Sequence, residues 1–337
     1  MKSTLVIIPQ YPVLMRYQEW WLHELCNHLS PLHVINPNVS SPQTHREIKQ
    51  FSIVTPAVEY ELRQIQHLHN LLETLPENTV LFFADISFPG LFVGYVPLIK
   101  KLRPDVKLVG FCHATSANYK DFWEPVRNVK HVLEQFVFDF FDVVFVSTEY
   151  HANKLCKHFS IDKTKIIITY GLPVHPLLFE FKTDNKTKKC KTVVITSRID
   201  PQKIDMVEYD EITRICQKHG VEVVITQKVC SSWESYYNTI AKSSLLIMTG
   251  LEDTFGYPCL EATLLKTPIL APRRCCYPEI LTDDCIFSTA SEFEEKLEAV
   301  LEGRLTQVMC RLKDMYIEGS KNFWNTVRET IEKICER

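Results

Sequence analysis

Short apolar runs alternate with segments of helical periodicity along most of the chain. The runs are rich in Val, Ile, Leu and Phe, and they have the length of buried parallel strands. They cover residues 5–8, 33–35, 80–83, 106–111, 143–146 and 166–168 in the first half, and 193–196, 221–226, 245–248 and 269–271 in the second. Helical segments separate most of them, including 17–29, 57–75, 126–141 and 233–242. This alternation predicts an α/β fold built on doubly wound parallel sheets.

Length and charge narrow the picture. A chain of 337 residues favours two domains. The Lys-rich run over 182–191 is typical of a solvated linker between them. The net charge is only −3, which excludes a global basic field for nucleic acid or anionic membrane but leaves local patches open.

The sequence shows no clear targeting signal and no clear metal-binding motif. Met1-Lys2-Ser3 leads directly into the first strand, and no apolar run approaches the roughly 18 residues that span a bilayer. We therefore expect a cytoplasmic protein without a transmembrane segment. The 12 cysteines are scattered without a Cys-x-x-Cys pair, so we expect reduced thiols and no metal site.

The stretch from 244 to 272 carries the clearest candidate chemistry. An apolar strand leads into a polar loop and then to Pro258, a residue that suits the start of a helix. Asp253 therefore lies near the carboxyl end of a strand, and Glu261 in the first turn of a helix. Ligands of open α/β sheets bind at this edge, and a helix N-terminus there favours a phosphate.

Other polar residues also follow predicted strands. Arg198 and Lys203 follow the strand at 193–196, so two cations stand near the carboxyl end of that strand. In the first half, Asp85 and His113 are among the residues that follow strands. The ends of parallel strands lie along one edge, so these side chains can converge.

Together these segments resemble retaining GT-B glycosyltransferases, in particular the large family 4 group. The run Asp-Thr-Phe-Gly-Tyr-Pro-Cys-Leu-Glu over 253–261 is similar to the family's acid-x7-Glu motif. The run Ser-Arg-Ile-Asp-Pro-Gln-Lys over 197–203 is similar to its Gly-Arg-Leu-x-x-x-Lys segment, and His113 to the histidine that often ends its fourth strand. The resemblance is strong over 192–337 and weak over 1–170.

The resemblance implies a GT-B fold, in which two Rossmann-like domains face each other across a cleft. It implies an acceptor-binding domain over 1–172, a nucleotide-sugar-binding domain over 173–318, and a C-terminal helix over 319–337 that returns to the first domain. It also implies retaining transfer of a sugar to an acceptor hydroxyl. The donor would be a UDP- or GDP-linked sugar, with no permanently bound cofactor and no metal.

The family pattern assigns a role to each candidate residue. Arg198 and Lys203 would hold the diphosphate, Asp253 a hydroxyl of the transferred sugar, and Glu261 the ribose hydroxyls. His113 would face the reacting sugar. The predicted catalytic set is therefore Arg198, Lys203, Asp253 and His113, and the predicted donor-binding set is Arg198, Lys203, Asp253, Phe255, Gly256 and Glu261.

Three departures from the family pattern keep other classes open. Asp253 stands where the family usually has Glu, and the loop over 11–16 lacks the glycines that approach the donor. Cys275 and Cys276 replace a further pair of glycines, which leaves that loop less free to wrap a phosphate. The alternatives are a different GT-B chemistry, such as nucleotide-sugar epimerisation, and a non-catalytic nucleotide-sugar-binding protein.

The acceptor is the least defined part of the prediction. Tyr-Pro-Glu-Ile over 277–280 is similar to the queuosine-tRNA mannosyltransferase branch, and the helix at 17–29 lacks lysines of the kind that membrane-acting members carry. These features favour a nucleic-acid acceptor. The sharper hypothesis is a hydroxymethylated pyrimidine base in phage DNA, and the alternatives are a tRNA base, a glycan or a lipid-linked sugar.

A nucleic-acid acceptor would need local cations and stacking side chains. The candidate cations are Arg16, Lys120, Arg127, Lys186, Lys188 and Lys189. The candidate stacking residues are Tyr119, Phe122 and Trp123.

Overall fold

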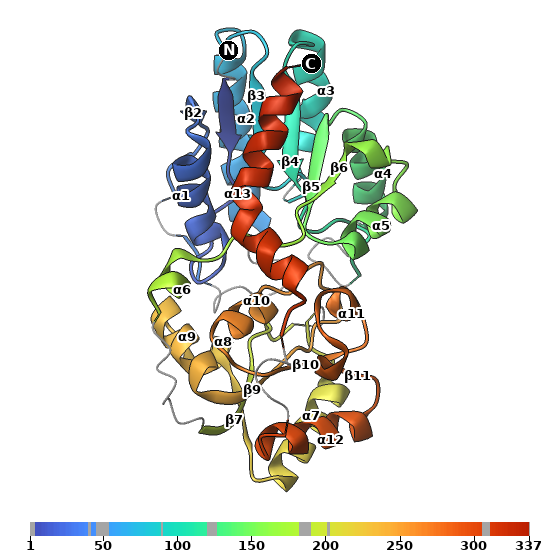
Figure 1. Cartoon of the computed structure of the whole chain (residues 1–337). Coiled ribbons are helices and arrows are strands. Elements are labelled where there is room, and N and C mark those ends of the chain that lie inside the picture. Colours follow the sequence, from blue (N-terminus) through green and yellow to red (C-terminus); the bar gives the residue numbers. More distant parts are fainter. Residues whose placement is uncertain are drawn as a thin grey trace. The chain divides into compact units, whose positions relative to one another are not determined.

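The structure is a computed structural model of the chain, and it describes residues 4–39, 42–44, 54–88, 90–119, 127–181, 190–200, 203–304 and 311–336 (Figure 1). The chain divides into two compact units. Unit 1 comprises Met1–Thr169 and Asn322–Arg337, and unit 2 comprises Tyr170–Lys321. Each unit has a parallel sheet of its own, which confirms the predicted α/β fold.

Unit 1 is built on a six-stranded parallel sheet with the order β2-β1-β3-β4-β5-β6. Its elements are β1 (Leu5–Ile8), α1 (Gln18–Leu29), β2 (His33–Val34), α2 (Val54–Leu72), β3 (Val80–Phe83), α3 (Phe92–Leu102), β4 (Lys107–Phe111), α4 (Arg127–Phe138), β5 (Val143–Val146), α5 (Glu149–His158), η2 (Lys163–Lys165) and β6 (Ile166–Ile168). Every residue of β1, β3 and β5 is buried, as the continuous apolar runs predict for strands covered on both faces.

Aromatic side chains join the end of the chain to the core of unit 1. The helix α13 (Asp314–Cys335) begins among the residues of unit 2 and ends among those of unit 1. The ring of Trp21 in α1 lies 5.8 Å from that of Phe323 and 6.2 Å from that of Trp324. Trp20, Trp21 and Leu25 are buried, so α1 packs its aromatic face into the core of unit 1.

Unit 2 is built on a five-stranded parallel sheet with the order β11-β10-β9-β7-β8. Its elements before α13 are α6 (Pro176–Glu180), β7 (Cys190–Ile195), α7 (Met206–Lys218), β8 (Glu222–Ile225), α8 (Thr226–Val229), α9 (Trp233–Lys242), β9 (Ser243–Ile247), α10 (Tyr257–Leu264), β10 (Ile269–Pro272), α11 (Tyr277–Ile280), η3 (Asp283–Cys285), β11 (Ile286–Phe287) and α12 (Ala290–Leu301). The short edge strand β11 was not among the predicted strands.

The strand order reverses beside the first strand of each sheet. In unit 1, β1 lies between β2 and β3, and in unit 2, β7 lies between β8 and β9. The chain leaves the first strand on one side and later returns on the other, so the loops after these strands diverge at their carboxyl ends. In open α/β sheets, ligands bind where the strand order reverses in this way.

None of the described helices is both long enough and apolar enough to cross a bilayer.

Candidate functional site

The acid loop, residues 248–256, joins β9 to α10 at the carboxyl end of the unit 2 sheet. Gly256 ends the loop with a left-handed backbone (φ +76°) and forms the N-cap of α10, with Pro258 in the first turn. The helix begins at Tyr257, which places Glu261 in its second turn instead of the predicted first. Asp253 lies in the loop itself, as predicted.

Asp253 and Lys203 form an ion pair across the switch point of unit 2. The Lys203 ammonium lies 2.5 Å from Asp253 Oδ1 and also donates to the Glu252 carbonyl at 2.5 Å. The other carboxylate oxygen of Asp253 accepts a hydrogen bond from the Tyr277 hydroxyl. The side chains of Lys203 and Asp253 are 20% and 15% exposed, so the pair is largely shielded from solvent but not fully buried. The structure thus unites two residues that the sequence proposed separately.

Arg198 lies in the β7–α7 loop, which also carries Lys203. Its Nε lies 3.0 Å from Asp200 Oδ2. Asp200 also accepts from the Lys203 backbone, at 3.0 Å through its carbonyl and 3.2 Å through Oδ1. Sequence reasoning missed this organising role of Asp200, although the residue stands between the two cations in the motif.

Glu261 is a buried carboxyl group of α10, 6% exposed. It accepts hydrogen bonds from the Tyr236 hydroxyl at 2.6 Å and from the Tyr237 hydroxyl at 3.4 Å. Burial raises the pKa of Glu261 to about 7. A carboxyl group with this environment can still accept a further hydroxyl, because each of its oxygens has more than one lone pair.

The two remaining donor-binding candidates have packing roles in the structure. Phe255 is buried (2% exposed), and its ring lies 6.1 Å from that of Tyr257. A Cβ added to Gly256 would lie 3.2 Å from the Tyr277 ring, so the glycine permits a close approach of the loop to that ring. Their predicted contact with the donor stays a prediction.

His113 belongs to unit 1 and follows β4. Its Nε2 lies 3.1 Å from the carbonyl oxygen of Ala84, and its ring lies 4.9 Å from the rings of both Tyr17 and Trp21. Burial lowers the pKa of His113 to about 3. The imidazole is therefore neutral near pH 7, and it can exchange hydrogen bonds with a sugar hydroxyl without adding charge.

Polar side chains also meet at the switch point of unit 1. Gln10 follows β1, and its amide donates to Asp85 Oδ2 at 2.8 Å, while the Ser87 backbone donates to Oδ1 at 2.9 Å. Burial raises the pKa of Asp85 to about 7. Asp85 was not among the predicted site residues, although its position after a strand was the signal that could have identified it.

The residues predicted to contact nucleic acid are only partly described. Lys120, Phe122, Trp123, Lys186, Lys188 and Lys189 lie outside the described residues. Arg127 donates to the Ser116 carbonyl at 2.6 Å and stacks its guanidinium 4.0 Å above the Tyr119 ring. Both Arg127 and Tyr119 therefore make contacts within unit 1, and Arg16 lies half-buried in the loop after β1.

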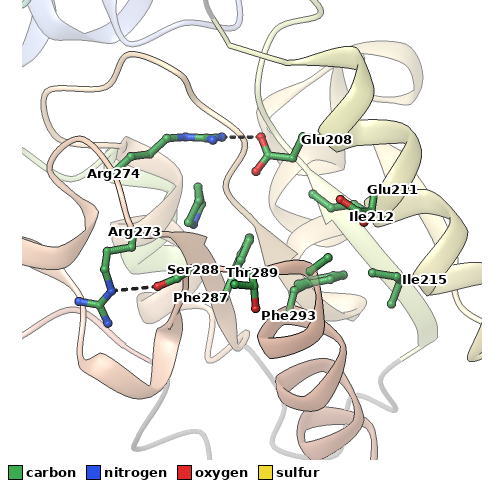
Figure 2. Close-up of a pocket in the computed structure, with 12 residues that line it drawn as sticks. Glu208, Glu211, Ile212, Ile215, Arg273, Arg274, Phe287, Ser288, Thr289 and Phe293 are labelled. Atoms are coloured by element: carbon green, nitrogen blue, oxygen red, sulfur yellow. Dashed lines mark hydrogen bonds and ion pairs between the residues drawn. The ribbon is translucent and has the colours of Figure 1, made fainter.

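A pocket of about 360 Å³ lies within unit 2, between α7 and the start of α12 (Figure 2). Ile212, Phe287 and Phe293 give it an apolar wall, and Arg273 and Glu208 line its edge. None of the predicted site residues lines it. Arg274 borders it and reaches Glu208 at 2.7 Å, so the pocket abuts the acid loop that Arg274 also contacts.

Potential metal ligands also approach one another in unit 2. The ligand atoms of His219, Glu294 and Glu298 lie within 4.8 Å of one another. The Lys218 ammonium already lies 2.7 Å from Glu294 Oε1, and His219 Nε2 lies 2.9 Å from the same oxygen. A cation on that carboxylate would compete with lysine, so we interpret the group as an ion-pair network between α7 and α12.

Solved structures match the chain over its full length, whereas no protein-family model and no curated protein matches its sequence. An α,α-trehalose-phosphate synthase (UDP-forming) from Burkholderia vietnamiensis matches with a TM-score of 0.64 and 10% identity, covering 100% of this chain and 99% of that one. Anabaena Alr3699/HepE in complex with UDP and glucose matches with a TM-score of 0.61 and 11% identity over 99% of each chain. A lipopolysaccharide outer core galactosyltransferase, WaaB, matches with a TM-score of 0.60 and 12% identity over 99% of each chain. The chain therefore has a GT-B-like α/β fold with two parallel sheets.

Proposed function

We propose that this protein is a glycosyltransferase that moves a sugar from a nucleotide-diphosphate sugar to an acceptor hydroxyl with retention of anomeric configuration. The observation that carries the proposal is the Lys203–Asp253 pair at the switch point of unit 2. Arg198 lies in the same loop as Lys203. The names of the solved neighbours add support, because they include a galactosyltransferase and a UDP-forming synthase.

The proposed roles of Lys203 and Arg198 follow from the negative charge that develops on the leaving diphosphate. When the bond between the sugar and the diphosphate breaks, negative charge develops on the leaving group, and Lys203 and Arg198 would stabilise it. Asp253 holds the Lys203 ammonium in place, so the cation is oriented before the reaction begins. The remaining lone pairs of Asp253 would accept a hydroxyl of the transferred sugar.

UDP is the nucleotide that we favour. The HepE structures are titled as complexes with UDP and glucose and with UDP-glucose, and the trehalose-phosphate synthase is named as UDP-forming. Glu261 would accept the ribose hydroxyls, with Tyr236 and Tyr237 orienting its carboxyl group.

A saccharide hydroxyl is the acceptor that we put first. The galactosyltransferase is named for a lipopolysaccharide outer core and the synthase for trehalose phosphate, so both names describe saccharide chemistry. In unit 1, Asp85 and the neutral His113 offer hydrogen-bonding groups that suit a hydroxyl. The hydroxymethylated pyrimidine in DNA stays a prediction from sequence, to be assayed beside the saccharides.

The experiment is an assay of the purified full chain against a panel of donors and acceptors. Donors would include UDP-glucose, UDP-galactose and a GDP-linked hexose, and acceptors would include hexose phosphates, oligosaccharides and hydroxymethylcytosine duplex DNA. Mass spectrometry would identify a product heavier by one sugar, and proton NMR would show the donor's anomeric configuration in it. Donor consumption without a transferred sugar would point to epimerisation or hydrolysis instead.

The variant Lys203→Ala tests the site itself. We expect transfer to fall by about a hundredfold or more, the effect of losing one preorganised charge contact. Lys228→Ala, at an exposed position of α8, serves as the control. Near-normal transfer by Lys203→Ala would remove this lysine from the site.

A further inference from the structure

The acid loop is held by side chains of residues 273–277, which comprise the loop after β10 and the first residue of α11 and which we call the clamp loop. Arg274 donates from Nη2 to the Thr249 carbonyl at 3.0 Å and from Nε to the Gly250 carbonyl at 2.9 Å. The Cys275 thiol donates to the Leu251 carbonyl at 3.2 Å. Three consecutive carbonyls of the acid loop are therefore fixed by two neighbouring side chains.

The two residues that follow in the acid loop are held as well. The Lys203 ammonium donates hydrogen bonds to the Glu252 carbonyl and to the Asp253 carboxylate. The Tyr277 hydroxyl donates to the other oxygen of that carboxylate. Asp253 is thus gripped at both oxygens. One contact comes from the lysine that the proposed reaction uses, and the other from Tyr277, which was not among the predicted site residues.

The clamp loop has a backbone conformation at Cys275 that favours glycine, but it carries side chains that bind the acid loop. Cys275 adopts φ +53°, a left-handed conformation in which a non-glycine residue is strained. The residue is kept there with a thiol that bonds the acid loop. The loop therefore makes its contacts with side chains, where a glycine would offer only backbone groups.

Tyr277 is buried for this contact. The side chain is 0% exposed, and burial raises the pKa of its hydroxyl well above the usual value, so it stays a hydrogen-bond donor. Gly250 completes the arrangement, since an added Cβ would lie 2.6 Å from the Tyr277 hydroxyl and 2.9 Å from Asp253 Cγ. Only a residue without a side chain leaves room for the carboxylate and the phenol together.

We propose that Tyr277 is a positioning residue for sugar transfer, acting through Asp253 to fix the carboxylate that holds Lys203. This role rests on the proposed function. Tyr277 contacts no substrate in the proposal, because its hydroxyl donates its hydrogen bond to Asp253. Without it, the Asp253 carboxylate would lose the contact that fixes its orientation, and the Lys203 ammonium would lose its fixed position.

The test is a double-mutant cycle on kcat/KM for the nucleotide-sugar donor, with Tyr277→Phe, Asp253→Asn and the double variant. We expect Tyr277→Phe to lower kcat/KM by about tenfold or more, as for loss of a hydrogen bond to a charged group. In the Asp253→Asn background, the same change should have less than about a twofold further effect, because residues that act as a unit are not additive. A tyrosine that served only the fold would act equally in both backgrounds.

The matched control is Tyr316→Phe, which removes another buried tyrosine hydroxyl from a carboxyl group of unit 2, that of Glu279. It should leave kcat/KM unchanged, and thermal unfolding should show whether Tyr277→Phe folds as the wild type does. If the wild type transfers sugar and Tyr277→Phe does so equally well, the positioning role is wrong. The same holds if Tyr277→Phe lowers kcat/KM by the same factor with and without Asp253→Asn. Either result would leave the proposed function standing. A wild-type protein that transfers no sugar from any donor would overturn the proposed function and this role with it.

Discussion

Among the described residues, the carboxyl groups of Glu61, Asp85 and Glu261 have pKa values raised toward neutral pH. Burial raises the pKa to about 7 in each case. Their hydrogen bonds act in the opposite direction but are outweighed. Glu61 accepts from the backbone of Leu91 and Phe92, at the start of α3, and still has the raised value. At the residue scale, burial therefore dominates hydrogen bonding at these carboxyl groups.

The contribution of Glu261 to the stability of the fold should decrease as the pH rises toward neutrality. A carboxyl group with a raised pKa binds a proton on folding, so its contribution is present below the unfolded pKa near 4.5 and is lost as the pH passes about 7. For Glu261 the loss should amount to at most roughly 3 kcal/mol in the free energy of unfolding. Denaturant unfolding followed from pH 5 to pH 9 would measure it.

The variant Glu261→Gln isolates the contribution of that residue. The amide cannot ionise, so the decline in stability between pH 5 and pH 9 should be shallower than in the wild type. Glu222→Gln, at an exposed position of β8, is the control and should leave the slope unchanged. An identical slope for Glu261→Gln and the wild type would show that Glu261 ionises as freely as in the unfolded chain.

Site residues could be predicted from the sequence where a motif within one segment marks them. They were missed where the role depends on contact between two segments that are distant in the sequence. Lys203 and Asp253 each stand in a recognisable motif, and the structure brings them together. Tyr277 was invisible as a site residue, because its contact with Asp253 depends on how two loops pack. The two tyrosine partners of Glu261 were missed for the same reason. A motif identifies a residue with a chemical role, whereas the residues that contact it are determined by tertiary packing.

At the element scale, the apolar runs predicted strands well and their ends less well. The run at 221–226 becomes β8 only up to Ile225, because Thr226 begins the short helix α8. The predicted helix at 57–75 forms as Val54–Leu72. Buried runs are set by the sheet core, while ends depend on local caps and on contacts with other elements. The sequence therefore predicted the fold class better than the boundaries.

Gly171 is an element boundary that a side chain cannot occupy. It follows β6 with φ +152°, and an added Cβ would lie 2.5 Å from the backbone nitrogen of Ser320 in α13 and 2.9 Å from its Cα. Both the backbone conformation and the close approach oppose any larger residue. We expect Gly171→Ala to lower the free energy of unfolding by roughly 2 kcal/mol or more, measured by denaturant unfolding.

Gly94→Ala is the matched control for this prediction. Gly94 lies inside α3, and nothing lies within 4 Å of an added Cβ. Alanine in a helix interior should raise stability by about 0.5–1 kcal/mol, so the same substitution should have opposite signs at the two sites. Equal effects would mean that the contact with Ser320 does not restrict position 171.

At the scale of the whole molecule, the same arrangement occurs in both units. Gln10 and Asp85 meet at the switch point of one sheet, and Lys203 and Asp253 meet at that of the other. The first pair joins a neutral amide to a carboxyl group with a raised pKa, whereas the second pairs an ammonium with a carboxylate. The proposed function places the diphosphate at the Lys203–Asp253 pair of unit 2 and the saccharide beside Gln10 and Asp85 of unit 1.

Salt dependence separates the two classes of acceptor. A saccharide without charge releases no counterions when it binds, whereas a duplex releases them with a log–log slope of about −0.9 per phosphate contacted. The net charge of −3 and the internal contacts of Arg127 argue against many phosphate contacts among the described residues. With donor saturating, we expect the KM for the saccharide acceptor to change by less than about twofold between 50 and 200 mM salt. Hydroxymethylcytosine duplex DNA should gain no sugar at either concentration. A glycosylated duplex, with acceptor affinity that falls about tenfold or more over this range, would instead establish the nucleic-acid acceptor and the cationic contacts that it requires.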